Sequence, residues 1–207
     1  TVDYYINQAK KLIELGTDEI AIKDMAGIGR PSSLGKIVKG IKKYNPNILV
    51  QYHGHSGPGF SVASALEVAR CGADIIDVSM EPLSWGTTHA DLLTVHEMLK
   101  DDGFIIKDID RESYMEVKSL TQQFIDEYLG LYINSKNRLM NSLLIESGLP
   151  GGMMGSLMND LEKSHISINK WLKRNNKSEI SIDTLFSSLL EEVKYIWPIM
   201  GYPPLVT

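Results

Sequence analysis

The sequence predicts an α/β protein: the C-terminal part of a TIM (β/α)8 barrel, about three βα units long, followed by a helical extension. Three short apolar strands recur at nearly regular intervals in the first half, each separated from the next by one helix, which is typical of parallel sheets. The chain has 207 residues, whereas a complete barrel takes about 250. We therefore expect a partial barrel in residues 1–82 and an incomplete helical lobe in residues 83–207.

The elements of the partial barrel alternate along the chain. Apolar residues at helical spacing over 3–15 predict a first helix, which Gly16 ends. Nearly continuous apolar runs predict strands at 19–24, 48–53 and 75–79, and such runs are typical of parallel strands covered on both faces. Between the strands, Pro31 opens one helix and a second spans 61–70.

The second half gives almost entirely helical signals. Apolar stripes predict helices through 92–99, 114–131 and 157–172. Ser181 is expected to cap a fourth helix, which Pro198 ends, and the polar run 174–178 is interpreted as the loop before it.

Composition and charge exclude several classes of protein. The chain carries 21 basic and 26 acidic side chains, a net charge of −5, which argues against nucleic-acid binding through a basic surface. No apolar run reaches the roughly 18–20 residues of a membrane span and no signal peptide opens the chain, so direct membrane insertion is not expected. The single cysteine, Cys71, excludes an internal disulfide framework and favours a reducing compartment.

The clearest candidate for chemistry is His53-Gly54-His55, at the C-terminal end of the predicted second strand. Side chains two residues apart on a strand project to the same face, so both imidazoles could bind one metal ion. Barrel enzymes place their active sites at this end of the strands. Because the pattern is short, a pair of solvent-facing loop histidines is the open alternative.

Lys23 ends the preceding strand and is expected beside His53 at the same rim. Three roles are open for this amine. It could form a Schiff base with a carbonyl substrate, it could take up CO₂ as a carbamate and become an anionic oxygen ligand, or it could be a salt-bridged surface cation. Asp24, which points the other way, and Asp77 on the third strand are interpreted as structural.

Other polar and glycine-rich features are given structural interpretations. The segment 150–156 contains three glycines before a helix, which would let backbone N–H groups approach a ligand, although a turn between helices is the simpler interpretation. His165 continues an apolar stripe and is expected in or near the core. His89 and His96 lie seven residues apart and are expected on a solvated helix face.

Four segments with matching spacing carry a family resemblance: residues 22–27 (IKDMAG), His53-x-His55, residues 73–78 (ADIIDV) and residues 150–152 (PGG). Together they resemble the carboxyltransferase domain of biotin-dependent enzymes, which include pyruvate carboxylase, the oxaloacetate decarboxylase alpha subunit and the transcarboxylase 5S subunit. The final residues 201–207 (GYPPLVT) look most like the decarboxylase branch.

This resemblance implies a divalent metal such as zinc, manganese or cobalt, bound by a carbamylated Lys23, by His53 and His55, and by an aspartate from an upstream strand. That aspartate, and an arginine and a glutamine that hold the keto acid in the family, have no match here, so the chain is expected to be a fragment, inactive by itself. The helical lobe is implied to be a carboxyltransferase extension that funnels toward the active site.

The sequence departs from the family pattern at two places. Ser56 follows His55 where the family often has aspartate, which leaves a carboxylate partner of the histidines unassigned. The family also has a proton-shuttling threonine or serine a few residues after Pro-Gly-Gly. Gly155 occupies that position by count, and the role is assigned to the neighbouring Ser156.

The reaction implied by the resemblance is carboxyl transfer between carboxybiotin and a 2-oxo acid, pyruvate or oxaloacetate, in the carboxylase or the decarboxylase direction. The chain has no biotinyl-lysine motif, so biotin is expected on a carrier domain or a separate carrier subunit. A homo-oligomer in the cytoplasm is expected, with association with a membrane decarboxylase complex left open.

Three other functions remain open. An aldol-type metal-dependent lyase or synthase, resembling HMG-CoA lyase or isopropylmalate synthase, would share the two histidines and the metal but typically has a small residue in place of Lys23. A Schiff-base aldolase using Lys23 would leave the histidines unexplained. A non-catalytic scaffold or docking segment would use none of these residues.

Overall fold

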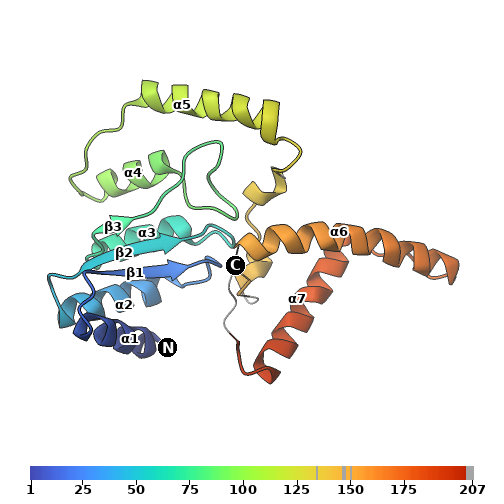
Figure 1. The fold of residues 1–207 in the computed structure, drawn as a ribbon, viewed down its shortest axis with the longest axis horizontal. Helices are drawn as coiled ribbons and strands as arrows, with labels where there is room; N and C mark the ends of the chain where they lie inside the picture. The colour runs from blue at the N-terminus through green and yellow to red at the C-terminus, as the bar shows by residue number, and fades with distance from the viewer. Residues whose placement is uncertain (134, 146–147, 150, 204–207) are drawn as a thin grey trace.

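Helices and strands alternate through the N-terminal part of the computed structural model, which describes residues 1–133, 135–145, 148–149 and 151–203 (Figure 1). The alternation matches the predicted order of elements. In chain order these are α1 (Val2–Glu14), β1 (Glu19–Asp24), α2 (Pro31–Tyr44), β2 (Leu49–Gly54), α3 (Ser61–Arg70) and β3 (Ile75–Ile76).

The three strands form one parallel sheet in the order β1-β2-β3, as the βαβ pattern predicts. The register places Lys23 opposite His53. β3 is shorter than the predicted 75–79. The Asp77 N–H still donates to the Tyr52 carbonyl, but β2 ends at Gly54, and the next pairing is an isolated parallel bridge between Ser79 and Asp91.

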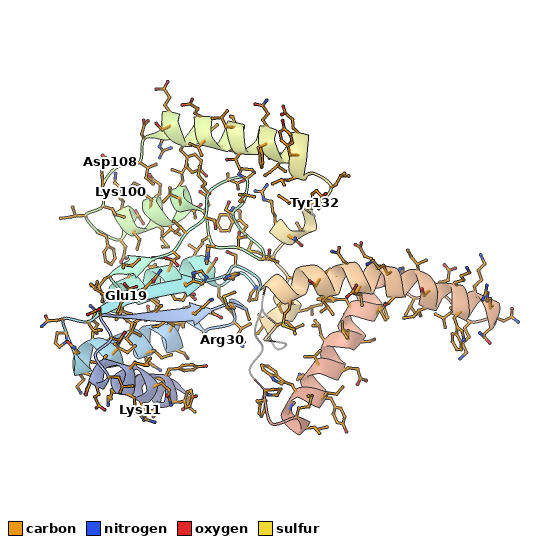
Figure 2. All side chains as sticks on the ribbon, in the orientation of Figure 1. Lys11, Glu19, Arg30, Lys100, Asp108 and Tyr132 are labelled. Atoms are coloured by element: carbon orange, nitrogen blue, oxygen red, sulfur yellow. The ribbon has the colours of Figure 1, made fainter. Side chains whose placement is uncertain are left out.

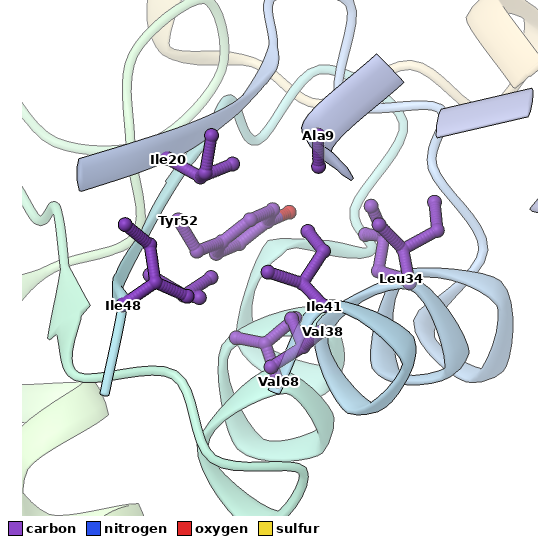
Figure 3. Packing of buried hydrophobic residues seen from close by; sticks show 10 residues of the cluster. Ala9, Ile20, Leu34, Val38, Ile41, Ile48, Tyr52 and Val68 are labelled. Atoms are coloured by element: carbon purple, nitrogen blue, oxygen red, sulfur yellow. The ribbon is translucent and has the colours of Figure 1, made fainter. Parts of the chain in front are cut away.

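The main core lies between one face of the sheet and the helices that cover it (Figure 3). Val38, Ile41, Val50 and Val68 are at most 1% exposed there, and Tyr52 is 2% exposed. The other face is uncovered, so Ala21, Lys23, Leu49 and Ile75 are exposed or only partly buried, and the expectation of strands covered on both faces is wrong for this chain. In a closed barrel, the uncovered face would be the interior.

Among the described residues, the elements after the sheet are all helical. They are α4 (Leu92–Asp101), α5 (Arg111–Phe124), which continues into a π-helical turn (Ile125–Leu129), two short 3-10 helices (Ser135–Arg138 and Ser142–Ile145), α6 (Gly151–Arg174) and α7 (Ile182–Ile199). α4 packs beside α3, and α6 and α7 project away from the sheet as a pair (Figure 1). A second core, which includes Leu161, Phe186 and Leu190, joins these two helices.

The ends of these helices agree with the sequence at some points and differ at others. Ser181 caps α7 by accepting from the Thr184 N–H at 3.0 Å, and the helix continues one residue past Pro198. The glycine-rich segment is not a turn before α6, because the helix begins at Gly151 itself. The N–H groups of the first helical turn have no partners within the helix. Glycine therefore destabilises a helix less in this turn than in the helix interior. The predicted boundary between the partial barrel and the helical lobe, at residue 82, stays a prediction.

Two further observations concern the surface. In the described part of the chain, none of the helices is long and apolar enough to cross a membrane. Lys100 at the end of α4 pairs with Asp108 at 2.6 Å, whereas Tyr132, after α5, is 83% exposed (Figure 2).

Candidate metal centre

His53 and His55 stand together at the C-terminal end of β2, with ring centroids 5.4 Å apart. Their side chains are half-buried. The residue between them must be very small, because a Cβ on Gly54 would lie 2.0 Å from the Tyr52 hydroxyl oxygen, which lies beneath the strand end. The position of the strand end that carries both histidines therefore depends on the packing of Tyr52 in the main core.

A third histidine, His89, joins the pair. Its ring centroid lies 4.3 Å from that of His53 and 4.8 Å from that of His55. One ligand nitrogen from each of the three rings lies within 4.8 Å of the other two. Imidazole nitrogens are ligands that suit transition ions such as zinc, so the chemistry of this donor set fits a divalent metal.

The expectation that His89 and His96 share a solvated helix face is wrong for both residues. Asp91 is the N-cap of α4, accepting from the Leu93 N–H at 2.9 Å, so His89 lies in the preceding loop. His96 is only 7% exposed, and its Nε2 bonds to the Lys107 carbonyl at 3.1 Å. The aspartate before an apolar helical stripe was the sequence signal that could have placed His89 outside the helix.

Asp77 has a more direct role than the structural one expected for it. One of its carboxylate oxygens bonds to Nδ1 of His53 at 2.6 Å, and the other accepts from the Gln51 side chain at 2.7 Å. Its pKa is lowered by these hydrogen bonds, although burial opposes the shift most strongly. The carboxylate partner that Ser56 could not provide is therefore supplied by the next strand.

Burial lowers the pKa of His55 and of His89, and the hydrogen bonds to the Thr87 and Gly54 carbonyls oppose this shift. A lower pKa favours the neutral imidazole, which is the form that binds a metal. The ammonium of Lys23 is among the charges that act on His55.

Lys23 and Asp24 leave β1 on opposite sides, as expected. Lys23 is exposed on the uncovered face, and its role stays a prediction. Asp24 caps the following loop by accepting from the N–H groups of Ile28 at 3.1 Å and Gly29 at 2.8 Å, and burial raises its pKa. Its structural interpretation is confirmed.

Two assignments in α6 have different outcomes. Ser156 is exposed within α6, and its proton-shuttling role stays a prediction. His165, expected in or near the core, is half-buried, and its Nε2 bonds to the Ile180 carbonyl at 2.7 Å.

Gly27→Ala is expected to lower the free energy of unfolding by about 2–4 kcal/mol and to disturb the histidines. Gly27 has a φ of +67°, and a Cβ there would lie 2.3 Å from the backbone oxygen of His55. Urea denaturation measures the loss. Gly16→Ala is the control, since its φ is +92° but nothing lies within 4 Å of the added carbon. An equal loss for both variants would contradict the proposed clash.

Comparisons with known proteins place the chain in a family. The model of the HMGL-like family matches residues 1–121. A pyruvate carboxylase subunit of Methanocaldococcus jannaschii is 29% identical over an alignment that covers 100% of this chain and 33% of that protein. The methylmalonyl-CoA carboxyltransferase 5S subunit of Propionibacterium freudenreichii is 26% identical, with 100% of this chain and 37% of that protein covered.

Solved structures agree about the fold. The carboxyl transferase domain of Rhizobium etli pyruvate carboxylase superposes with a TM-score of 0.75 at 20% identity, covering 97% of this chain and 30% of that chain. The predicted partial barrel with a helical extension is thereby confirmed. The chain spans about a third of the length of the relatives it matches. Because the family model covers more than half of its residues, the chain belongs to the HMGL-like family.

Proposed function

We propose that this chain carries the metal centre of a biotin-dependent carboxyltransferase that acts on a 2-oxo acid such as pyruvate or oxaloacetate. The observation that supports this function most is the gathering of His53, His55 and His89 at the C-terminal end of β2, with Lys23 opposite His53. The two relatives named above are a pyruvate carboxylase subunit and a carboxyltransferase subunit.

In this proposal His53 and His55 hold the divalent ion, and Asp77 fixes the ring of His53 through their 2.6 Å hydrogen bond. When bound, the ion supplies positive charge that lowers the cost of negative charge on a nearby substrate oxygen. Lys23 takes up CO₂ as a carbamate, which gives the site an anionic oxygen ligand where a free ammonium could give none.

Carboxyl transfer balances as follows. The carboxyl group leaves the biotin nitrogen as CO₂, and that nitrogen receives the proton from the enol form of the 2-oxo acid. The enolate carbon then bonds to CO₂. We assign the relay of this proton to the Ser156 hydroxyl, which can pass it on without carrying charge. In the decarboxylase direction every step reverses.

The partners in this proposal follow from the same chemistry. Biotin is supplied by a carrier domain or a separate carrier protein, the active protein is a homo-oligomer, and it works in the cytoplasm. The resemblance of residues 201–207 favours the decarboxylase branch, in which the protein would associate with a membrane complex.

A second candidate is an aldol-type lyase or synthase, which the name of the matching family favours. Such enzymes share the histidine pair and the metal. Lys23 disfavours this function, because the lyases and synthases resembling HMG-CoA lyase typically have a small residue there.

The test is an isotope-exchange assay on the full-length protein that carries this chain, with labelled pyruvate, oxaloacetate and biotin. We expect exchange that disappears after chelation and returns with added zinc, manganese or cobalt. Cleavage of an HMG-CoA-type thioester without any exchange would instead establish the lyase alternative. His165→Gln, a change within α6, serves as the control and should leave the exchange rate unchanged.

A further inference from the structure

We propose that His89 is a third metal ligand, so that the chain holds a divalent cation through three imidazole Nε2 atoms. The inference concerns the same site as the proposed function and rests on that function only for the identity of the centre. His89 lies 34 residues beyond His55 in the sequence, in a loop rather than a strand, and neither the spacing motif nor the implied ligand set of Lys23, His53 and His55 includes it.

Each of the three rings makes a hydrogen bond through Nδ1. Nδ1 of His53 meets the Asp77 carboxylate at 2.6 Å, Nδ1 of His55 meets the Thr87 carbonyl at 2.5 Å, and Nδ1 of His89 meets the Gly54 carbonyl at 2.9 Å. Carbonyl and carboxylate oxygens only accept, so Nδ1 is the donor atom of each ring in these hydrogen bonds. Nε2 is therefore the atom that each ring offers to a metal, which is the arrangement found around metal-bound histidines.

Hydrogen bonds hold the loop that carries His89 in place before any ion binds. The ring of His55 bonds to the loop at Thr87, and the ring of His89 bonds back to the strand end at Gly54. Between them, the Ser56 N–H donates to the Thr88 carbonyl at 2.7 Å. Strand end and loop thus fix each other, and His89 loses little conformational entropy when it binds an ion.

The distances between the histidine nitrogens are close to those required around one metal ion. Two nitrogens bound to one tetrahedral zinc ion are about 3.4 Å apart. One nitrogen from each ring lies within 4.8 Å of the others, so the three rings stand close enough for side-chain rotation to bring them onto one ion. Three imidazole ligands also leave a coordination position for the oxygen of the Lys23 carbamate.

This ligand set separates cation binding from the chemistry of Lys23. With three nitrogens in place, the ion is held before the lysine reacts with CO₂, and the carbamate adds an oxygen ligand to an existing site. Zinc should therefore bind without bicarbonate, and bicarbonate should tighten the binding through Lys23 because the carbamate and the ion stabilise each other.

The test is zinc binding to the full-length protein that carries this chain, measured against a competing chelator with and without bicarbonate. We expect His89→Gln to weaken zinc at least about 100-fold, because losing a ligand costs at least as much as losing an outer-shell partner. The glutamine amide can still donate to the Gly54 carbonyl, which keeps the loop in place. Lys23→Ala should abolish any tightening of zinc binding by bicarbonate, and the control His165→Gln should change the affinity less than about threefold.

Nitrogen-15 spectra of the unaltered chain give a readout that needs no variant. On adding zinc, the Nε2 resonances of His53, His55 and His89 should shift together. Shifts at His53 and His55 without one at His89, an unchanged affinity in His89→Gln, or no zinc binding at all would each overturn the assignment. Tight zinc binding without carboxyl exchange in the full-length protein would refute the proposed function and leave the ligand assignment standing.

Discussion

Lys23→Ala in the full-length protein is expected to reduce carboxyl exchange about 10³-fold or more, and Lys23→Arg is expected not to restore it. Removing the carbamate would remove an anionic oxygen ligand, and metal-assisted charge stabilisation is worth several kcal/mol of barrier. Arginine keeps the positive charge at the end of β1 but cannot take up CO₂ as lysine does.

The measurement is the exchange rate at saturating metal, with metal content determined for each variant. Lys36→Ala on the exposed side of α2 is the matched control, because it removes a lysine that lies outside the strand ends carrying the histidines. If Lys23→Arg retained activity, the charge alone would suffice and the carbamate role would be excluded.

The isolated 207-residue chain is expected to form dimers or larger aggregates through its sheet. Its exposed surface is 12932 Å², about a third more than the roughly 9,700 Å² of a compact monomer of 23.1 kDa. β1 is an edge strand, and a groove of about 550 Å³, lined by residues such as Tyr5, Leu12 and Ile20, lies along it. Unpaired strand edges beside apolar surface template association.

Hydrogen exchange and light scattering test this expectation together. Residues 18–80 should be less protected than residues 111–197 in any monomer that is isolated, because the sheet lacks partners whereas contacts between the helices are local. Ala21→Lys places a charge on the exposed face of the edge strand and should reduce association. A monomer with equal protection in both regions would show that the sheet needs no further strands.

Local signals were enough to predict most of the elements. The strand Glu19–Asp24 and the helix Ser61–Arg70 agree with the prediction to the residue, because charge, proline and glycine bound their apolar runs. The pairing of His53 with His55 followed from the two-residue period of a strand. These features depend on residues that are close together in the sequence, so local sequence patterns are enough to predict them.

The features that were missed depend on contacts between distant segments. His89 lies in the site because its loop folds back on the end of β2. The hydrophobic periodicity of the sequence, which predicts helices and strands, gives no information about how this loop folds. Asp77 can bond to His53, 24 residues earlier in the sequence, because adjacent parallel strands place the two side chains next to each other. The glycines that open α6 were interpreted as a turn because glycine is a poor helix former, so the local sequence gives no sign that the helix begins there.

The uncovered face of the sheet also determines the dielectric environment of the histidines. Two unit charges 4 Å apart interact by about 1 kcal/mol in water and by about 4 kcal/mol at an effective dielectric constant of about 20. The difference between these two interaction energies is about 3 kcal/mol. If it stabilised the charge that develops in the transition state, it would raise the rate by a factor of roughly 150. Binding of the metal ion and the rate of carboxyl transfer therefore depend on different parts of the structure. In the proposed site, the three imidazoles bind the ion, whereas the rate depends on excluding water from the face of the sheet that carries Lys23 and His53.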